Sequence, residues 1–217
     1  MINNFNTVGL STYQAIKTDI IFGVLPPLKK LKLIELKDNY NTSISMLREI
    51  LSRLSGDGFV IAQEQKGFIV SPVSKTDLIE IANLRILIES YALKQSIENS
   101  DIEWEGTLIA AHHNLNYHEN KMINNKSYER ENWKRYDSEF HKTLIINCNS
   151  TNLMKLHQLI FDKYLRYQLL VLTFRGEGSI KEHKDILDSA LNKDFIKAQK
   201  ILEEHIQNGI DHAMKNF

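Results

Sequence analysis

The 217-residue sequence predicts a mostly α-helical protein, in which an N-terminal winged helix-turn-helix is followed by an all-helical antiparallel bundle. Three observations lead to this expectation. All three prolines lie in the first third of the chain, at positions 26, 27 and 72. The apolar spacing changes from helical to strand-like at residues 59–70. Beyond residue 76 there is no proline and glycine is scarce, which favours long helices.

The first third contains signals for three short helices and a hairpin. "STYQAIKTDIIFG" begins with a Ser or Thr cap and stops at Gly23, while "LKLIELKDNY" and "SISMLREILSRL" carry apolar residues three and four positions apart. Two strands, 59–62 and 68–70, then flank a polar turn that ends in Gly67. This order is typical of a winged helix-turn-helix.

The remaining two thirds should form the bundle. Pro72 cannot lie inside a helix and Ser74 can cap the next one, so we place a domain boundary between residues 73 and 74. The predicted domains are therefore 1–73 and 74–217. Short connections favour antiparallel neighbours. The predicted helices of the second domain are 75–99, 101–123, 127–147, 150–174, 179–191 and 195–214.

Composition limits the location and the partners. No run approaches the roughly 18 apolar residues of a membrane span, and the N-terminus lacks the basic-then-apolar order of a signal peptide. We therefore expect a cytoplasmic protein with no membrane partner. Equal numbers of basic and acidic residues, 27 of each, argue against coating of nucleic acid, although residues 1–75 carry nine Lys or Arg against six Asp or Glu. The single cysteine, Cys148, cannot form an intrachain disulfide.

A winged helix-turn-helix places its second helix in the major groove of double-stranded DNA and its wing beside the phosphates. Short hydroxyl side chains at the start of that helix suit phosphates or base edges, and Arg48 can reach a phosphate or a guanine. Spacing alone is equally consistent with serines that only cap the helix and with Arg48 paired to a surface acid. The candidate DNA-binding residues are Thr42, Ser43, Ser45, Arg48, Gln65, Lys66 and Gly67.

The segment "LREILSRLSGDGFVIAQEQKGFIV" resembles the signature of GntR-type bacterial transcription factors, and the resemblance covers residues 10 to 72. The chain departs from the family pattern at four positions. It has Ile44 in place of Arg, Met46 in place of Pro, Ile50 in place of Ala, and Leu28 in place of the Gly of a Pro-Gly pair. Loss of the arginine at Ile44 removes a common base contact, which implies an operator unlike the family consensus.

Four residues of the second domain could converge on a metal. Asp137 and His141 are four apart in a predicted helix. His183 and His205 are nearly equidistant from a turn near Lys193, so they come level in an antiparallel hairpin. If the helix with Asp137 packs opposite, one carboxylate and three imidazoles suit Zn²⁺, Ni²⁺ or Mn²⁺ with positions left open. On spacing alone, four unrelated surface residues are the simpler interpretation.

The same four residues, in order and approximate spacing, resemble the metal motif of the FCD ligand-sensing domain found in the FadR-type branch of GntR regulators. "ANLRILIES" is also similar to that domain's opening helix, with Arg85 and Glu89 at the Arg-x3-Glu spacing. The other histidines match nothing in this pattern. They are residues 112, 113, 118, 157 and 212.

The resemblance implies a metabolite-responsive repressor that binds a palindromic operator as a homodimer. It also implies a small carboxylate or dicarboxylate effector at the metal. A cationic side chain could hold the far end of such an acid, and Arg85 and Arg166 are candidates, although a surface ion pair explains each of them equally well. "STNLMKLHQLIFDKYLRYQLLVL" and "EQKGFIV" look most like the repressors of glutarate and 2-hydroxyglutarate breakdown. Because no general base lies beside a nucleophile, we do not expect an enzyme. The alternatives are a metal-dependent hydrolase with a vestigial DNA-binding unit and a DNA-binding protein with a purely structural metal.

Overall fold

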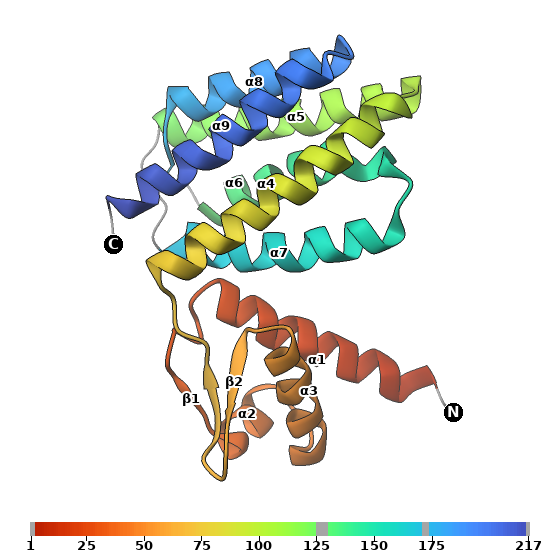
Figure 1. Cartoon of the computed structure of the whole chain (residues 1–217). Coiled ribbons are helices and arrows are strands. Elements are labelled where there is room, and N and C mark those ends of the chain that lie inside the picture. Colours follow the sequence, from red (N-terminus) through yellow and green to blue (C-terminus); the bar gives the residue numbers. More distant parts are fainter. Residues whose placement is uncertain (1–2, 125–129, 171–173, 216–217) are drawn as a thin grey trace. The chain divides into compact units, whose positions relative to one another are not determined.

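The computed structural model describes residues 3–124, 130–170 and 174–215. The chain divides into two compact units, Met1–Ser74 and Lys75–Phe217, and each is described by itself (Figure 1). The predicted helices 127–147 and 150–174 include positions 127–129 and 171–173, which lie outside the described residues.

The first unit is a winged helix-turn-helix. Its helices are α1 (Asn3–Ile21), α2 (Leu33–Asn39) and α3 (Ile44–Gly56), and its strands are β1 (Lys30–Leu31), β2 (Val60–Gln63) and β3 (Gly67–Val70). The strands form an antiparallel sheet in the order β1-β3-β2. Ile69 on the central strand β3 lies between Lys30 on β1 and Ile61 on β2. The sequence did not predict β1, because two residues are too few to show an alternating pattern.

Helix α3 illustrates why this sequence folds as it does. Ser43 is its N-cap, and the side-chain oxygen accepts a hydrogen bond of 3.1 Å from the backbone N–H of Met46. One face of the helix is buried and contains Leu47, Ile50, Leu51 and Leu54. Each such side chain contributes on the order of 2 kcal/mol by leaving water.

The start of α1 differs from the prediction, and Leu28 has an unusual backbone conformation. Helix α1 begins at Asn3, although a start at Ser11 was predicted from its hydroxyl. The three asparagines and Gly9 in the segment before Ser11 hid this extension, because they are weak helix formers. Leu28 has a φ of 66°, a left-handed conformation that glycine adopts without strain, at the position where the resemblance led us to expect glycine.

The second unit is a helical bundle. It contains α4 (Lys75–Glu98), α5 (Ile102–Asn124), α6 (Arg130–Ile145), the short 3₁₀ helix η1 (Ile146–Cys148), α7 (Thr151–Leu170), α8 (Glu177–Leu191) and α9 (Phe195–Met214). Helix α5 packs on α6 and α8, α8 packs on α9, and α4 contacts α6, α7 and α9 (Figure 1). Large apolar side chains such as Phe140, Phe161 and Tyr164 are almost fully buried between these helices. In the parts of the chain that the structure describes, no helix is both long and apolar enough to cross a membrane.

Candidate metal centre

Three histidines from three helices meet inside the bundle. His141 lies on α6, His183 on α8 and His205 on α9, and all three are buried. One ring nitrogen from each lies within 4.8 Å of the others. The ring centroids of His183 and His205 are 4.5 Å apart, and that of His141 lies 5.8 Å from the first and 5.3 Å from the second.

A carboxylate from a neighbouring helix or turn supports each of these rings. An ionised carboxylate can only accept a hydrogen bond, so the Nδ1 of His141 and of His183 carries the proton, which leaves the Nε2 lone pair of each for a ligand. The Nε2 atoms of His141 and His183 are buried and have no hydrogen-bond partner. The Nδ1 to carboxylate distances are 3.1 Å for His141 with Glu89, 2.9 Å for His183 with Glu119 and 2.8 Å for His205 with Glu182.

These two features are what a metal-binding imidazole requires: a free nitrogen lone pair and an outer partner that fixes the ring. Burial lowers the pKa of His141 to about 4, and burial together with the nearby His183 holds the pKa of His205 well below its usual value. Both rings are therefore neutral near pH 7. The residues present fit a divalent transition metal, for which neutral imidazole is a common ligand.

Glu89 connects this centre to the rest of the core. Its carboxylate accepts a hydrogen bond of 2.5 Å from the Nε of Arg85. It also lies 3.0 Å from the Nε2 of His157 and contacts His141. Burial raises the pKa of Glu89, but Arg85 and His141 outweigh this effect, so the pKa is well below its ordinary value. Glu89 is thus an ionised, fully paired support for the His141 ring.

Asp137 lies beside the three histidines, without joining all of them. Its Oδ1 is 3.6 Å from the Nε2 of His183, and its Oδ2 is 3.6 Å from the Nζ of Lys134. Within the described ranges, only the three histidines bring one possible ligand atom each to within 4.8 Å of one another, and Asp137 is not part of this group. Burial raises the pKa of Asp137, but Lys134 and His141 outweigh it, and the pKa falls below its usual range.

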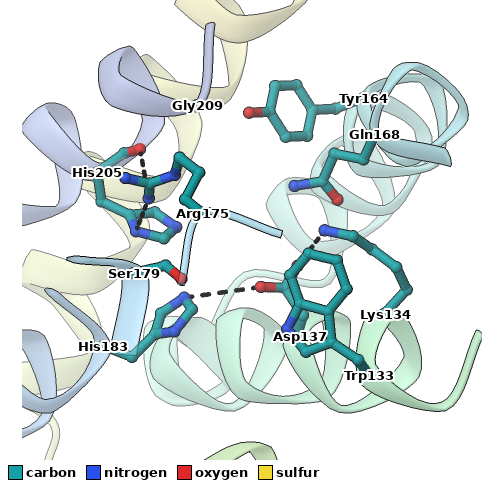
Figure 2. Close-up of a pocket in the computed structure, with 10 residues that line it drawn as sticks. All are labelled: Trp133, Lys134, Asp137, Tyr164, Gln168, Arg175, Ser179, His183, His205 and Gly209. Atoms are coloured by element: carbon teal, nitrogen blue, oxygen red, sulfur yellow. Dashed lines mark hydrogen bonds and ion pairs between the residues drawn. The ribbon is translucent and has the colours of Figure 1, made fainter. Parts of the chain in front are cut away.

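A small cavity of about 30 Å³ adjoins the centre (Figure 2). A volume of this size holds a water molecule or an ion. Two cationic side chains line it, Lys134 next to Asp137 and Arg175 next to His205. The other lining residues are Trp133, Tyr164, Gln168, Ser179, His183 and Gly209.

Arg175 also fixes the third histidine. Its guanidinium donates two hydrogen bonds to Glu182, at 3.0 and 2.5 Å, and a longer one to the backbone oxygen of His205 at 3.4 Å. The Nδ1 of His205 lies 2.8 Å from Glu182, which can only accept, and 3.1 Å from the Nη2 of Arg175, which can only donate, so these contacts are compatible with either tautomer of the ring. The backbone of α9 at Gly209 lies close to the hydroxyl of Tyr164. A Cβ added at Gly209 would lie 2.7 Å from that oxygen.

Comparison with known proteins places these features in a family. The FCD domain model matches residues 80–208, and the model of bacterial regulatory proteins of the gntR family matches residues 9–70. The chain belongs to the GntR family and carries an FCD domain. The HTH-type transcriptional regulator BphR of Paraburkholderia xenovorans (strain LB400) is 30% identical over 96% of this chain and 86% of its own length.

Other relatives agree with this assignment. The HTH-type transcriptional repressor GlaR of Escherichia coli (strain K12) is 27% identical and covers 91% of each chain. McbR/YncC of E. coli has the same fold, with a TM-score of 0.81 at 19% identity over 96% of this chain and 97% of that one. The metal-free FCD domain of TM0439 aligns with 67% of this chain and 97% of its own, at 23% identity and a TM-score of 0.54. The protein is a transcriptional regulator and not an enzyme.

The two arginines predicted to hold an effector lie elsewhere in the FCD domain. Arg85 is 1% exposed, bonded to Glu89, with its guanidinium 4.5 Å from the centre of the Phe161 ring. Arg166 is buried on α7. Neither belongs to the lining of the cavity beside the histidines. Their effector role stays a prediction, and the cations at the cavity are Lys134 and Arg175.

Sequence reasoning singled out Glu89 for its spacing from Arg85 but not for its contact with His141, and it missed Glu119 and Glu182 behind the other two histidines. One of them had a usable signal: Leu115, Glu119 and Met122 are four and three residues apart and all buried, so Glu119 occupies a core position of the FCD helix α5. A carboxylate in an apolar stripe requires a buried partner. Here the partner is His183.

In the GntR domain, the candidate DNA-binding residues lie at the start of α3 and on the wing. Ser45 and Arg48 are exposed on α3, Thr42 is half-buried before it, and Ser43 is the cap. The exposed wing residues are Gln65 and Lys66 in the turn and Gly67 at the start of β3.

Proposed function

We propose that this regulator is a homodimeric repressor, with a DNA-binding domain at residues 1–73 and an effector- and metal-binding domain at residues 74–217. A small carboxylate bound at the metal centre would release it from a palindromic operator. The observation that carries the proposal is the inward-facing, unpartnered Nε2 atoms of His141 and His183, each with a carboxylate behind its ring.

His141, His183 and His205 are proposed to hold one Zn²⁺, Ni²⁺ or Mn²⁺, with Asp137 as a fourth ligand. FCD domains can bind metals, and this domain supplies three buried imidazoles in contact with Glu89, Glu119 and Glu182. When bound, the metal would supply a Lewis-acidic centre with positions open to a carboxylate. The chain's own residues orient the rings and exclude water from the surrounding core.

The effector is proposed to be a dicarboxylate of the size of glutarate or 2-hydroxyglutarate. The cavity lining supplies Lys134 and Arg175 as cations for a carboxylate that is not on the metal. Arg85 and Arg166 remain candidates for the same role. Because the cavity is only about 30 Å³, side chains of its lining must move to admit an acid of this size. That movement would couple the ligand to a change in the domain.

DNA binding is assigned to Thr42, Ser43, Ser45 and Arg48 on or next to α3, with the wing at Gln65, Lys66 and Gly67 beside the phosphates. Homodimer symmetry would require an operator with matching two-fold symmetry. The acid then acts by binding one arrangement of the two DNA-binding domains better than the other, which shifts the population of the operator-binding state.

The first experiment is elemental analysis of the purified protein beside a His183→Ala, His205→Ala double variant. About one transition metal per chain in the parent and none in the variant supports the centre. No metal in either, even after reconstitution, removes the metal from the proposal and leaves the DNA-binding regulator.

A gel-shift titration at fixed salt tests the sensing role, since operator affinity depends on ionic strength. Glutarate and 2-hydroxyglutarate are expected to weaken operator binding by the metal-loaded parent and to have no effect on the double variant. A second candidate, a purely structural metal, is favoured by the small volume of the cavity. It is distinguished by a melting temperature that depends on metal together with an operator affinity that no acid changes.

A further inference from the structure

Three of the four carboxylates around the three histidines have a Lys or Arg partner, and the fourth, Glu119, contacts the Nδ1 of His183. Glu89 is paired with Arg85, and Glu182 with Arg175. Asp137, 2% exposed, has Lys134 as its ion-pair partner, at 3.6 Å. Lys134 is itself 2% exposed, and its Nζ lies 3.7 Å from the centre of the Trp133 ring. Both members of this last pair line the cavity beside the histidines (Figure 2).

A buried carboxylate without a nearby cation is strongly unfavourable. Lys134 supplies that cation in the protein as it stands. The distance of 3.6 Å is that of an ion pair without a hydrogen bond, and the Oδ2 of Asp137 has no hydrogen-bond partner. The ammonium is thus held by charge and by the Trp133 ring, with little directional bonding to keep it in place.

The same carboxylate also faces the metal centre. Its Oδ1 is 3.6 Å from the Nε2 of His183, an atom that is buried and unpartnered. A divalent cation held by the histidines would attract Asp137 and repel the ammonium on its other oxygen. The two cations would repel each other across the carboxylate, and this repulsion weakens the hold of Asp137 on the ammonium.

We propose that Lys134 is the resident counter-ion of Asp137 and that a divalent metal displaces its ammonium from this carboxylate on binding. This inference rests on the metal centre of the proposed function. Lys134 acts as a positioning residue. It stabilises the metal-free domain, it weakens metal binding, and after displacement its ammonium remains at the cavity wall.

The test compares full-length Lys134→Met with the parent, since methionine keeps an unbranched, apolar chain without the charge. Lys142→Met is the matched control, because Lys142 is exposed on the same helix. Lys134→Arg keeps the charge. Affinity for Ni²⁺ is measured by competition with a chromogenic chelator at fixed pH, and melting temperatures are measured with Ni²⁺ and with EDTA.

Lys134→Met is expected to bind Ni²⁺ about tenfold more tightly than the parent, because a repelling charge is gone. Its melting temperature should fall in EDTA and match the parent with Ni²⁺. A packing defect would lower the melting temperature both in EDTA and with Ni²⁺. Lys142→Met should behave as the parent, and Lys134→Arg should not gain affinity.

A second variant covers the case in which Lys134→Met fails to fold without metal. The double variant Lys134→Met, Asp137→Asn removes both charges, so it should recover the parent's melting temperature in EDTA. Equal or weaker Ni²⁺ binding by Lys134→Met, or a double variant no more stable than Lys134→Met, overturns the inference while the metal centre stands. A parent that binds no Ni²⁺ overturns the inference together with the metal part of the proposed function.

Discussion

Glu119→Gln tests whether the carboxylates behind the histidines prepare the centre for metal. Glu119 is fully buried on α5, and its Oε1 lies 2.9 Å from the Nδ1 of His183. The amide keeps the shape of the side chain, but it removes the charge and can present an N–H to the ring. An N–H facing Nδ1 would move the imidazole proton to Nε2, the atom that must bind the metal.

The expected loss in metal affinity is about 10- to 100-fold, or roughly 1.4 to 2.7 kcal/mol, as for other outer partners of metal-binding histidines. Affinity is measured by chelator competition and stability by thermal melting in EDTA. The control is Glu103→Gln, an exposed change on the same helix. An unchanged metal affinity in Glu119→Gln, with a melting temperature equal to that of the parent, would refute the orienting role of Glu119.

Three further predictions follow from other parts of the chain. Arg48→Ala should weaken operator binding by about 1 to 3 kcal/mol in gel shifts at fixed salt, and unchanged affinity would exclude a DNA contact there. Leu28→Gly should raise the free energy of unfolding in urea by about 1 kcal/mol, because the left-handed backbone at Leu28 strains a side chain; lower stability would contradict this. Burial lowers the pKa of His112 from 6.5 to about 4, so the folded protein resists protonation there. The contribution of His112 to stability should therefore fall as pH drops below 6.5, by about 2 kcal/mol at pH 5, and His112→Leu should remove this part of the pH dependence in urea titrations at pH 7 and 5.

The part of the fold set by local periodicity could be predicted from the sequence. Helix α3 follows from Leu47, Ile50, Leu51 and Leu54 on one face, all of which are buried. The facing positions of His183 and His205 follow from the symmetry of an antiparallel hairpin, and their ring centroids are 4.5 Å apart. Both inferences need only the geometry of a helix and a short turn.

The rest depends on how helices far apart in sequence rotate against each other. Glu89 on α4 supports His141 on α6, and no spacing along the chain encodes that contact. The same holds for Arg175, which precedes α8 and reaches Glu182 and His205. Asp137 was predicted to converge with all three histidines, and the structure places it near His183, with Lys134 on its other oxygen.

Helix α4 gives the bundle a mechanical property. It begins at Lys75, the first residue after the DNA-binding unit, and carries Glu89 about 21 Å further along its axis, at 1.5 Å per residue. The backbone hydrogen bonds of a helix make it stiff over this length. Glu89 contacts both His141 and His157, so a displacement of either ring would act on this helix. A tilt of α4 by a few degrees about Glu89 would displace Lys75 by about 1 to 2 Å.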